Sequence, residues 1–195
     1  MATEFASDGR VRRGERSGAA IVDALIELVG KGVLEPTAQQ VAARAGVGIR
    51  TVFRRFSDME RLFTEMSTRM QAQVLPLLLD GAPRGDLADR GRALVARRAA
   101  FFERISRYKR AANLRRSRSP YLRDRHAELV RLLRAELLRW LPELRRAPAA
   151  LVDALELATS FEAWDRLRSE QRLGYERAHA AVERLVLGLI AEVSR

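Results

Sequence analysis

The stretch GVGIRTVFRRF, residues 46–56, places three arginines and a threonine among large apolar side chains and contains no carboxylate. Arginine can donate two parallel hydrogen bonds to O6 and N7 of guanine or bind a phosphate, and threonine can donate to a phosphate or contact a thymine methyl group. Arg50 and Arg54 lie one helical turn apart, as do Thr51 and Arg55. This pattern suits a nucleic-acid partner, and a solvated basic face on an ordinary helical hairpin is the alternative.

The apolar residues of the same stretch also have helical spacing. Ile49, Val52, Phe53 and Phe56 follow the pattern i, i+3, i+4, i+7, which is typical of one face of an amphipathic helix. We therefore expect these four side chains to form the buried stripe of a short helix, with the arginines on its opposite face.

The residues before this stretch predict two helices and a tight turn. Apolar spacing indicates a first helix that ends near Gly30, and Thr37 with Gln40 has the spacing of a capping box that begins a second helix. Gly46 can adopt the left-handed conformation that turns the chain into the next helix. Two short helices joined in this way, the second with a cationic outer face, form a helix-turn-helix, which can place its second helix in the major groove of DNA.

Helical patterns continue to the end of the chain. Ser57 and Glu60 have the spacing of another capping box, which predicts the start of a fourth helix. Pro76 and the sequence DGAPRGD at 80–86 predict a boundary between two modules. Further helices are expected near residues 87–106, 108–117, 120–141, 149–171 and 175–194. No segment alternates polar and apolar residues over the length of a strand, so the expected fold class is all-α.

The last two predicted helices, 149–171 and 175–194, are apolar over more than one stripe. A helix with so wide an apolar face needs two packing partners. One partner can be the core of the chain itself, and we expect the other to be a second copy, so that four helices form a bundle between two subunits.

Length and composition exclude several classes of protein. The chain has 195 residues, enough for a substantial hydrophobic core. It has no cysteine, which excludes disulfides, thiolate zinc sites and cysteine nucleophiles. The sequence shows neither a secretory leader nor a run of about 18 uncharged apolar residues. We expect a soluble, cytoplasmic protein without a membrane partner, whose residues 1–15 form a flexible arm.

The positive charge is unevenly distributed. The formal net charge is +11, but residues 1–70 carry 11 basic and 9 acidic side chains. Between Arg90 and Arg125 there are 13 basic residues and two acidic ones. This basic cluster can reflect a compositional preference for arginine, a binding site for an anion, additional attraction to DNA, or a face that contacts only solvent.

The sequence offers little for catalysis. His126 and His179 are the only histidines, and neither has a second residue at the spacing of a metal site. Glu156 and Glu162 lie in a mostly apolar helix without an evident acid or base partner. No glycine-rich phosphate loop or nucleophile elbow is present. We therefore expect no catalytic residue, no metal site and no cofactor, and the protein is not expected to be an enzyme.

The segment TAQQVAARAGVGIRTVFRRFSDMERLF, residues 37–63, resembles the N-terminal module of the TetR family of transcriptional regulators. The resemblance extends over about residues 16–66. It implies DNA contacts from two residues at the start of the second helix and from six on the third helix: Thr37, Gln39, Ile49, Arg50, Thr51, Phe53, Arg54 and Arg55.

Three residues depart from the family pattern. Phe53 stands where the family usually has tyrosine, so a hydroxyl that can reach a phosphate is missing. Met59 replaces a lysine, which removes a positive contact to the DNA backbone, and Arg50 replaces a small residue, which adds one. These departures leave a second interpretation open, a helical adaptor or small-molecule-binding protein that does not bind an operator.

The resemblance also implies an architecture and a mode of action. A three-helix DNA-binding domain at 16–66 would follow the arm, and a larger helical domain at 67–195 would bind an effector and form the homodimer. Two subunits would bind a palindromic DNA operator, and a small molecule would release them. Repression is the usual action in the family.

The effector is not identified by the sequence. Candidate pocket residues are the aromatic side chains of the second domain and one amide, each of which can equally belong to the ordinary core: Phe101, Phe102, Tyr108, Asn113, Tyr121, Phe161 and Trp164. The basic residues from Arg97 to Arg125 favour an anionic effector, such as an acyl-CoA or a carboxylate, as one hypothesis.

Overall fold

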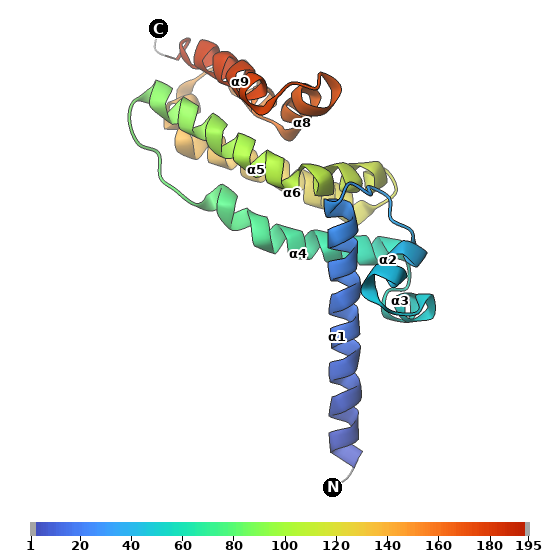
Figure 1. Cartoon of the computed structure of the whole chain (residues 1–195). Coiled ribbons are helices and arrows are strands. Elements are labelled where there is room, and N and C mark those ends of the chain that lie inside the picture. The colour runs from blue at the N-terminus through green and yellow to red at the C-terminus, as the bar shows by residue number, and fades with distance from the viewer. Residues whose placement is uncertain (1–2, 194–195) are drawn as a thin grey trace. The chain divides into compact units, whose positions relative to one another are not determined.

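The computed structural model describes the backbone of residues 3–193 and the side chains of residues 16–193 (Figure 1). Every regular element in this part of the chain is helical, which confirms the expected all-α class. The helices pack into two compact units. The first contains the chain up to Gln73 together with Arg107–Arg123, and the second contains Val74–Ser106 and the chain from Asp124 onward.

Three helices precede the predicted fourth one, as expected: α1 (Thr3–Gly30), α2 (Ala38–Ala45) and α3 (Ile49–Arg55). The core of the first unit forms around Ile21 and Leu25 of α1, which are fully buried. Residues 3–15, where a flexible arm was expected, form the first part of α1 in the described backbone, and their flexibility stays a prediction.

Helix α4 (Met59–Leu79) begins one residue later than its sequence pattern predicts. Oδ1 of Asp58, rather than the hydroxyl of Ser57, accepts from the backbone nitrogen of Arg61 at 2.8 Å. The capping box predicted from Ser57 and Glu60 is therefore wrong, because an adjacent carboxylate is an equally good cap. Pro76 lies inside α4 and does not end it, since a proline near the end of a helix removes only one internal hydrogen bond.

Helix α5 (Leu87–Arg116) is continuous, where two helices at 87–106 and 108–117 were expected. No glycine or proline interrupts this segment after Gly91. The buried hydroxyl of Ser106 donates to the carbonyl of Phe102 at 2.6 Å, which satisfies it inside the helix. Helix α6 (Pro120–Trp140) follows a short turn, as predicted.

The prediction of a single helix at 149–171 is wrong. The chain forms the short 3-10 helix η1 (Pro142–Arg146), then α7 (Ala149–Ala158), α8 (Phe161–Asp165) and the π-helical turn η2 (Arg166–Glu170). The break falls at Thr159 and Ser160, because the hydroxyl of Ser160 accepts from the backbone nitrogen of Ala163 at 3.1 Å and starts a new helix. Helix α9 (Tyr175–Ile190) closes the second unit.

Among the described residues, no helix combines the length and the apolar character that crossing a bilayer requires.

Candidate functional site

The turn between α2 and α3 has well-defined geometry at both ends of α2. The hydroxyl of Thr37 accepts from the nitrogen of Gln40 at 3.2 Å, and the nitrogen of Thr37 donates to the Gln40 side chain at 2.8 Å, which confirms the predicted capping box. Gly46 ends α2 with φ 66° and ψ 31°, the left-handed conformation that glycine adopts without strain. Both short helices pack on α1 (Figure 1).

Only one side chain of α3 is fully buried. Val52 is 1% exposed, and Phe56, which follows the helix, is half-buried. Ile49 and Phe53 are 39% and 48% exposed, so the buried stripe of four residues predicted from the sequence is wrong for these two. The reason is that α3 has seven residues and packs on α1 and α2 from one side, which covers a narrower arc than the stripe occupies.

The three arginines of α3 form an outward cationic ridge. Arg50, Arg54 and Arg55 are all exposed, and none makes a hydrogen bond or ion pair within the part of the chain that the structure describes. Arg44 of α2 differs, because its guanidinium binds the carboxylate of Glu27. Free guanidinium groups keep their full capacity to bind an external anion.

Glu27 of α1, the partner of Arg44, is already engaged by two cations. The pKa of Glu27 is lowered to about 2, first because Arg44 donates a hydrogen bond to its carboxylate and second because Lys31 does. Lys31 Nζ lies 2.7 Å from Oε1 of Glu27. The negative charge of Glu27 is therefore engaged by two cations and does not compensate the arginines of α3.

The other residues expected at this surface are also accessible. Thr37 and Gln39 are exposed, and Thr51 is half-exposed. The hydroxyl of Thr37 accepts the capping hydrogen bond, and its proton remains able to donate to a second group. All eight residues expected to contact DNA thus belong to one compact unit, on α2, on α3 or at the cap of α2.

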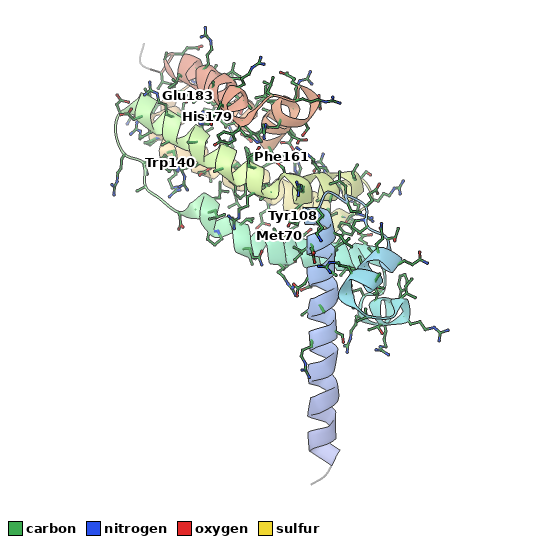
Figure 2. The ribbon with its side chains drawn as sticks, in the orientation of Figure 1. Met70, Tyr108, Trp140, Phe161, His179 and Glu183 are labelled. Carbon is green, nitrogen blue, oxygen red and sulfur yellow. The ribbon has the colours of Figure 1, made fainter. Side chains whose placement is uncertain are left out.

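The candidate effector residues divide between the two units. Phe101, Phe102, Phe161 and Trp164 are buried in the second unit, whereas Tyr108, Asn113 and Tyr121 belong to the first. Figure 2 labels Tyr108 and Met70, which both pack against the core of the first unit. The hydroxyl of Tyr121 lies 2.6 Å from that of Thr68, and Oδ1 of Asn113 accepts from Arg116 at 3.4 Å.

The aromatic residues of the second unit enclose almost no free space. The rings of Phe102 and Phe161 lie edge to face with centroids 5.7 Å apart. A cavity of about 10 Å³ is bordered by Phe102, Trp164, Arg98 and Thr159. Such a cavity holds at most one water molecule, so the described conformation has no room for a drug-sized effector at this position.

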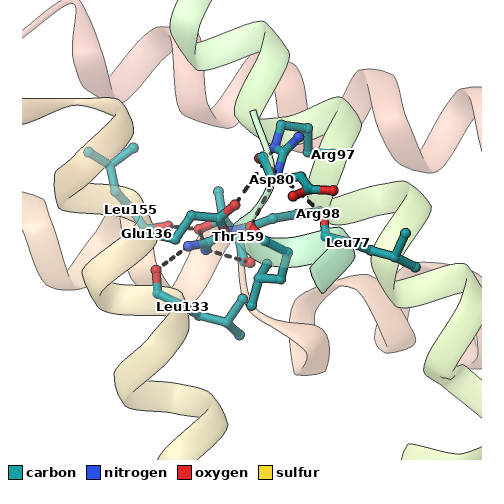
Figure 3. Close-up of polar contacts among 9 residues, drawn as sticks. Leu77, Asp80, Arg97, Arg98, Leu133, Glu136, Leu155 and Thr159 are labelled. Atoms are coloured by element: carbon teal, nitrogen blue, oxygen red, sulfur yellow. Dashed lines mark hydrogen bonds and ion pairs between the residues drawn. The ribbon is translucent and has the colours of Figure 1, made fainter. Parts of the chain in front are cut away.

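Much of the basic cluster makes structural contacts. Arg98 is 2% exposed and donates to Oε2 of Glu136 at 3.1 Å and to the carbonyl of Thr159 at 3.0 Å (Figure 3). Burial lowers the pKa of Arg98 and raises that of Glu136. Sequence reasoning grouped Arg98 with its basic neighbours and missed this pair, since the two residues lie 38 positions apart.

Arg97, the next residue, stabilises the end of α4. Its guanidinium donates to the carbonyls of Leu77 at 3.3 Å and Leu78 at 3.2 Å, and also to that of Asp80 (Figure 3). Nε of Arg97 lies 3.8 Å from Oε1 of Glu136. Arg97 thus satisfies carbonyl groups that the end of a helix leaves without internal partners.

Other members of the cluster are engaged in the same way. Arg90 pairs with Glu143, Arg107 donates to the carbonyl of Gly30, and the guanidinium of Arg115 lies 4.1 Å from the centre of the Phe63 ring. The excess of basic residues between Arg90 and Arg125 is therefore not a single free cationic surface.

The outer surfaces of α7 and α9 carry exposed leucines and two open hollows. Leu157 of α7 is 68% exposed and Leu185 of α9 is 55% exposed. A hollow of about 340 Å³ is lined by residues of both helices, including Leu151 and Leu189. A second, of about 360 Å³, lies along α9, where Figure 2 labels His179 and Glu183.

The sequence and the fold were compared with those of known proteins. Residues 21–66 match the family model of bacterial regulatory proteins of the tetR family. A search of curated proteins gives no significant relative. The fold is similar to that of a transcriptional regulator from Rhodococcus sp. Rha1, with a TM-score of 0.67, 23% identity, and coverage of 92% of this chain and 96% of that one. It is also similar to a chain from Mesorhizobium loti MAFF303099 assigned to the TetR family of transcriptional regulators, with a TM-score of 0.59, 16% identity, and coverage of 92% and 97%.

Proposed function

We propose that the chain, whose residues 21–66 match the family model of bacterial regulatory proteins of the tetR family, is a ligand-responsive repressor that binds a palindromic operator as a homodimer. The observation that carries the proposal is the cationic ridge of α3, where Arg50, Arg54 and Arg55 are exposed and have no acidic partner in the described chain. A protein that binds chromosomal DNA in this way acts in the cytoplasm.

In the proposed complex, α3 enters the major groove and the start of α2 contacts the DNA backbone. Arg50 and Arg54 point away from the core and reach base edges, where arginine recognises guanine. Thr37, Gln39 and Arg55 bind phosphates and fix the orientation of the helix. Thr51, Ile49 and Phe53 complete the contact surface.

We propose that two copies associate through α7 and α9. A single short helix binds DNA weakly, and two recognition helices one helical turn of DNA apart, about 34 Å, provide the affinity and the symmetry that match a palindrome. Exposed Leu157 and Leu185, together with the open hollows along α7 and α9, supply apolar surface that a second subunit can bury.

We propose that an effector acts through the second unit. Because the cavity beside Arg98 has a volume of only about 10 Å³, an effector of ordinary size that binds at this position must bind a more open conformation. It releases DNA only if it binds that conformation more tightly, typically by about 1–3 kcal/mol of coupling free energy. An anionic effector is the working hypothesis, and it must compete with the carboxylates and carbonyls that the arginines already contact.

The DNA-binding proposal is tested by a gel-shift titration of the full chain on the DNA upstream of its own gene. Arg54→Ala and Arg55→Ala should each weaken binding. Arg55→Ala, which removes a phosphate contact, should also lower the salt dependence of log K by about one, whereas Arg54→Ala should reduce the discrimination between bases. Arg145→Ala and Arg146→Ala are the matched controls, because both arginines are exposed and lie in η1 of the second unit. If Arg54→Ala and Arg55→Ala bind with the same affinity as the wild type and the two controls, the adaptor interpretation is favoured instead.

A further inference from the structure

Two large apolar side chains lie beside the cationic ridge and are accessible to solvent. Ile49 is 39% exposed and Phe53 is 48% exposed, although Val52 of the same helix is buried in the core of the first unit. Residues 49 and 53 are four positions apart, so their side chains lie one above the other on the same side of α3. Together they form a small apolar strip on a helix whose other exposed large side chains are arginines.

The arrangement around the axis of α3 separates three kinds of surface. Successive residues of an α-helix are rotated by about 100°. Relative to buried Val52, Arg50 and Arg54 therefore point outward. Ile49 and Phe53 lie on one side of Arg50 and Arg54, and Thr51 with Arg55, the third arginine of the ridge, lies on the other. A helix that enters the groove with its arginines foremost brings the apolar strip against the bases of one strand.

We infer that Ile49 and Phe53 recognise thymine methyl groups in each operator half-site. The inference rests on the proposed DNA-binding function and deepens it by specifying which bases this flank selects. The 5-methyl group of thymine is the apolar feature that a base pair presents in the major groove. Covering it with Ile49 or Phe53 removes apolar surface of both partners from water.

DNA is the occupant that suits this strip, because of the charges around it. Arg50 and Arg54 border the strip, and α3 contains no acidic residue. A protein partner would have to supply both an apolar surface and several carboxylates, whereas a thymine next to its phosphates supplies an apolar group and negative charge at the spacing of one nucleotide.

The test begins with duplexes that the purified full chain selects from a random-sequence library. Each thymine of a selected half-site is then replaced, one at a time, by deoxyuridine, which differs only in lacking the 5-methyl group. At the positions facing the strip, wild-type affinity should fall about fourfold for each methyl lost, as expected for one buried carbon. Thymines elsewhere in the duplex should be insensitive to the replacement.

Each of the variants Phe53→Ala and Ile49→Ala should lose the discrimination at the base that the missing side chain contacts. Its affinity should be the same for the duplex with thymine at that position and for the duplex with deoxyuridine there. Neither variant should change the salt dependence, because neither removes a charge. Arg55→Ala is the matched comparison on the same helix, because Arg55 is the arginine proposed to bind a phosphate. It should lower the salt dependence while leaving the difference between thymine and deoxyuridine intact. Thermal melting of each variant checks that the exposed substitutions leave the fold unchanged.

Equal wild-type affinity for thymine and deoxyuridine at every position would overturn the inference while leaving DNA binding intact. A loss of affinity in Phe53→Ala that is the same for every duplex would also overturn the inference, because the ring would then contact the DNA backbone and not a thymine methyl group. If the library yields no enriched duplex, the proposed function and this inference both fail. If a variant does not fold, the comparison of thymine and deoxyuridine duplexes with the wild-type chain still tests the inference.

Discussion

Arg98 donates from Nε to Oε2 of Glu136 at 3.1 Å, and both side chains are only 2% exposed. Removing one partner of a buried ion pair leaves the other charge poorly compensated and typically costs about 3–5 kcal/mol; after loss of Arg98, Arg97 remains near Glu136, with its Nε 3.8 Å from Oε1. Arg98→Met should therefore lower the free energy of unfolding by about this amount, as measured by urea denaturation.

The double variant Arg98→Met with Glu136→Leu provides the control for this prediction. It removes both charges together, so its cost should be smaller than that of Arg98→Met alone. An unchanged unfolding midpoint in the single variant would show that the pair does not contribute to stability.

The ion pair between Arg44 and Glu27 should make stability depend on pH. The pKa of Glu27 is lowered from 4.5 to about 2, so between these values the unfolded chain binds more protons than the folded one. The stabilisation is therefore complete above pH 4.5 and is lost as the pH falls through 2. Glu27→Gln should remove this part of the pH dependence of the free energy of unfolding. Glu65→Gln, at an exposed site without an ion pair in the described chain, should not.

Two glycines of the turn should respond differently to the same substitution. Gly46 has φ 66°, and no atom lies within 4 Å of an added Cβ, so Gly46→Ala should destabilise through backbone strain alone, by about 1 kcal/mol. Gly48 has φ −69° and equally free space, so Gly48→Ala should change stability by less than about 0.5 kcal/mol. Equal unfolding midpoints for the two variants would contradict this account of the turn.

The hydroxyl of Tyr108 should decide whether a substitution at the end of α1 stabilises or destabilises the protein. A Cβ at Gly30 would lie 3.0 Å from this oxygen, while the nearest ring carbon is 3.9 Å away. Gly30→Ala should destabilise the wild type by about 1 kcal/mol through crowding. In a Tyr108→Phe background it should instead stabilise by up to about 1 kcal/mol, because alanine favours the helix. A double-mutant cycle by chemical denaturation measures the coupling, which should be absent if the two residues do not touch.

The proposed dimer should depend on the exposed leucines of α7 and α9. Leu157→Glu and Leu185→Glu would each place a charge in the buried surface between subunits, so sedimentation equilibrium should show a shift from dimer to monomer. Leu114→Glu is the matched control, because Leu114 is 53% exposed and lies in α5. A wild-type chain that sediments as a monomer at all concentrations would rule the dimer out.

Local sequence rules were sufficient for most helices and for the turn of the DNA-binding unit. The apolar spacing of α1 and α2, the capping box of Thr37 and the left-handed Gly46 all depend on residues within four positions of one another. The outward position of Arg54 and Arg55 was predictable for the same reason, since a charged side chain without a nearby partner is costly to bury.

Tertiary structure decided what depends on neighbours distant in the chain. The spacing of Ile49 and Phe53 is compatible with burial, and only the limited contact of α3 with α1 and α2 leaves them exposed. Nothing in the sequence distinguishes buried Arg98 from Arg97, because the carboxylate that pairs with Arg98 lies on another helix. Sequence by itself determined the helices and the cationic face through short-range geometry, whereas packing determined which apolar and charged side chains remain accessible, because burial depends on which surfaces meet.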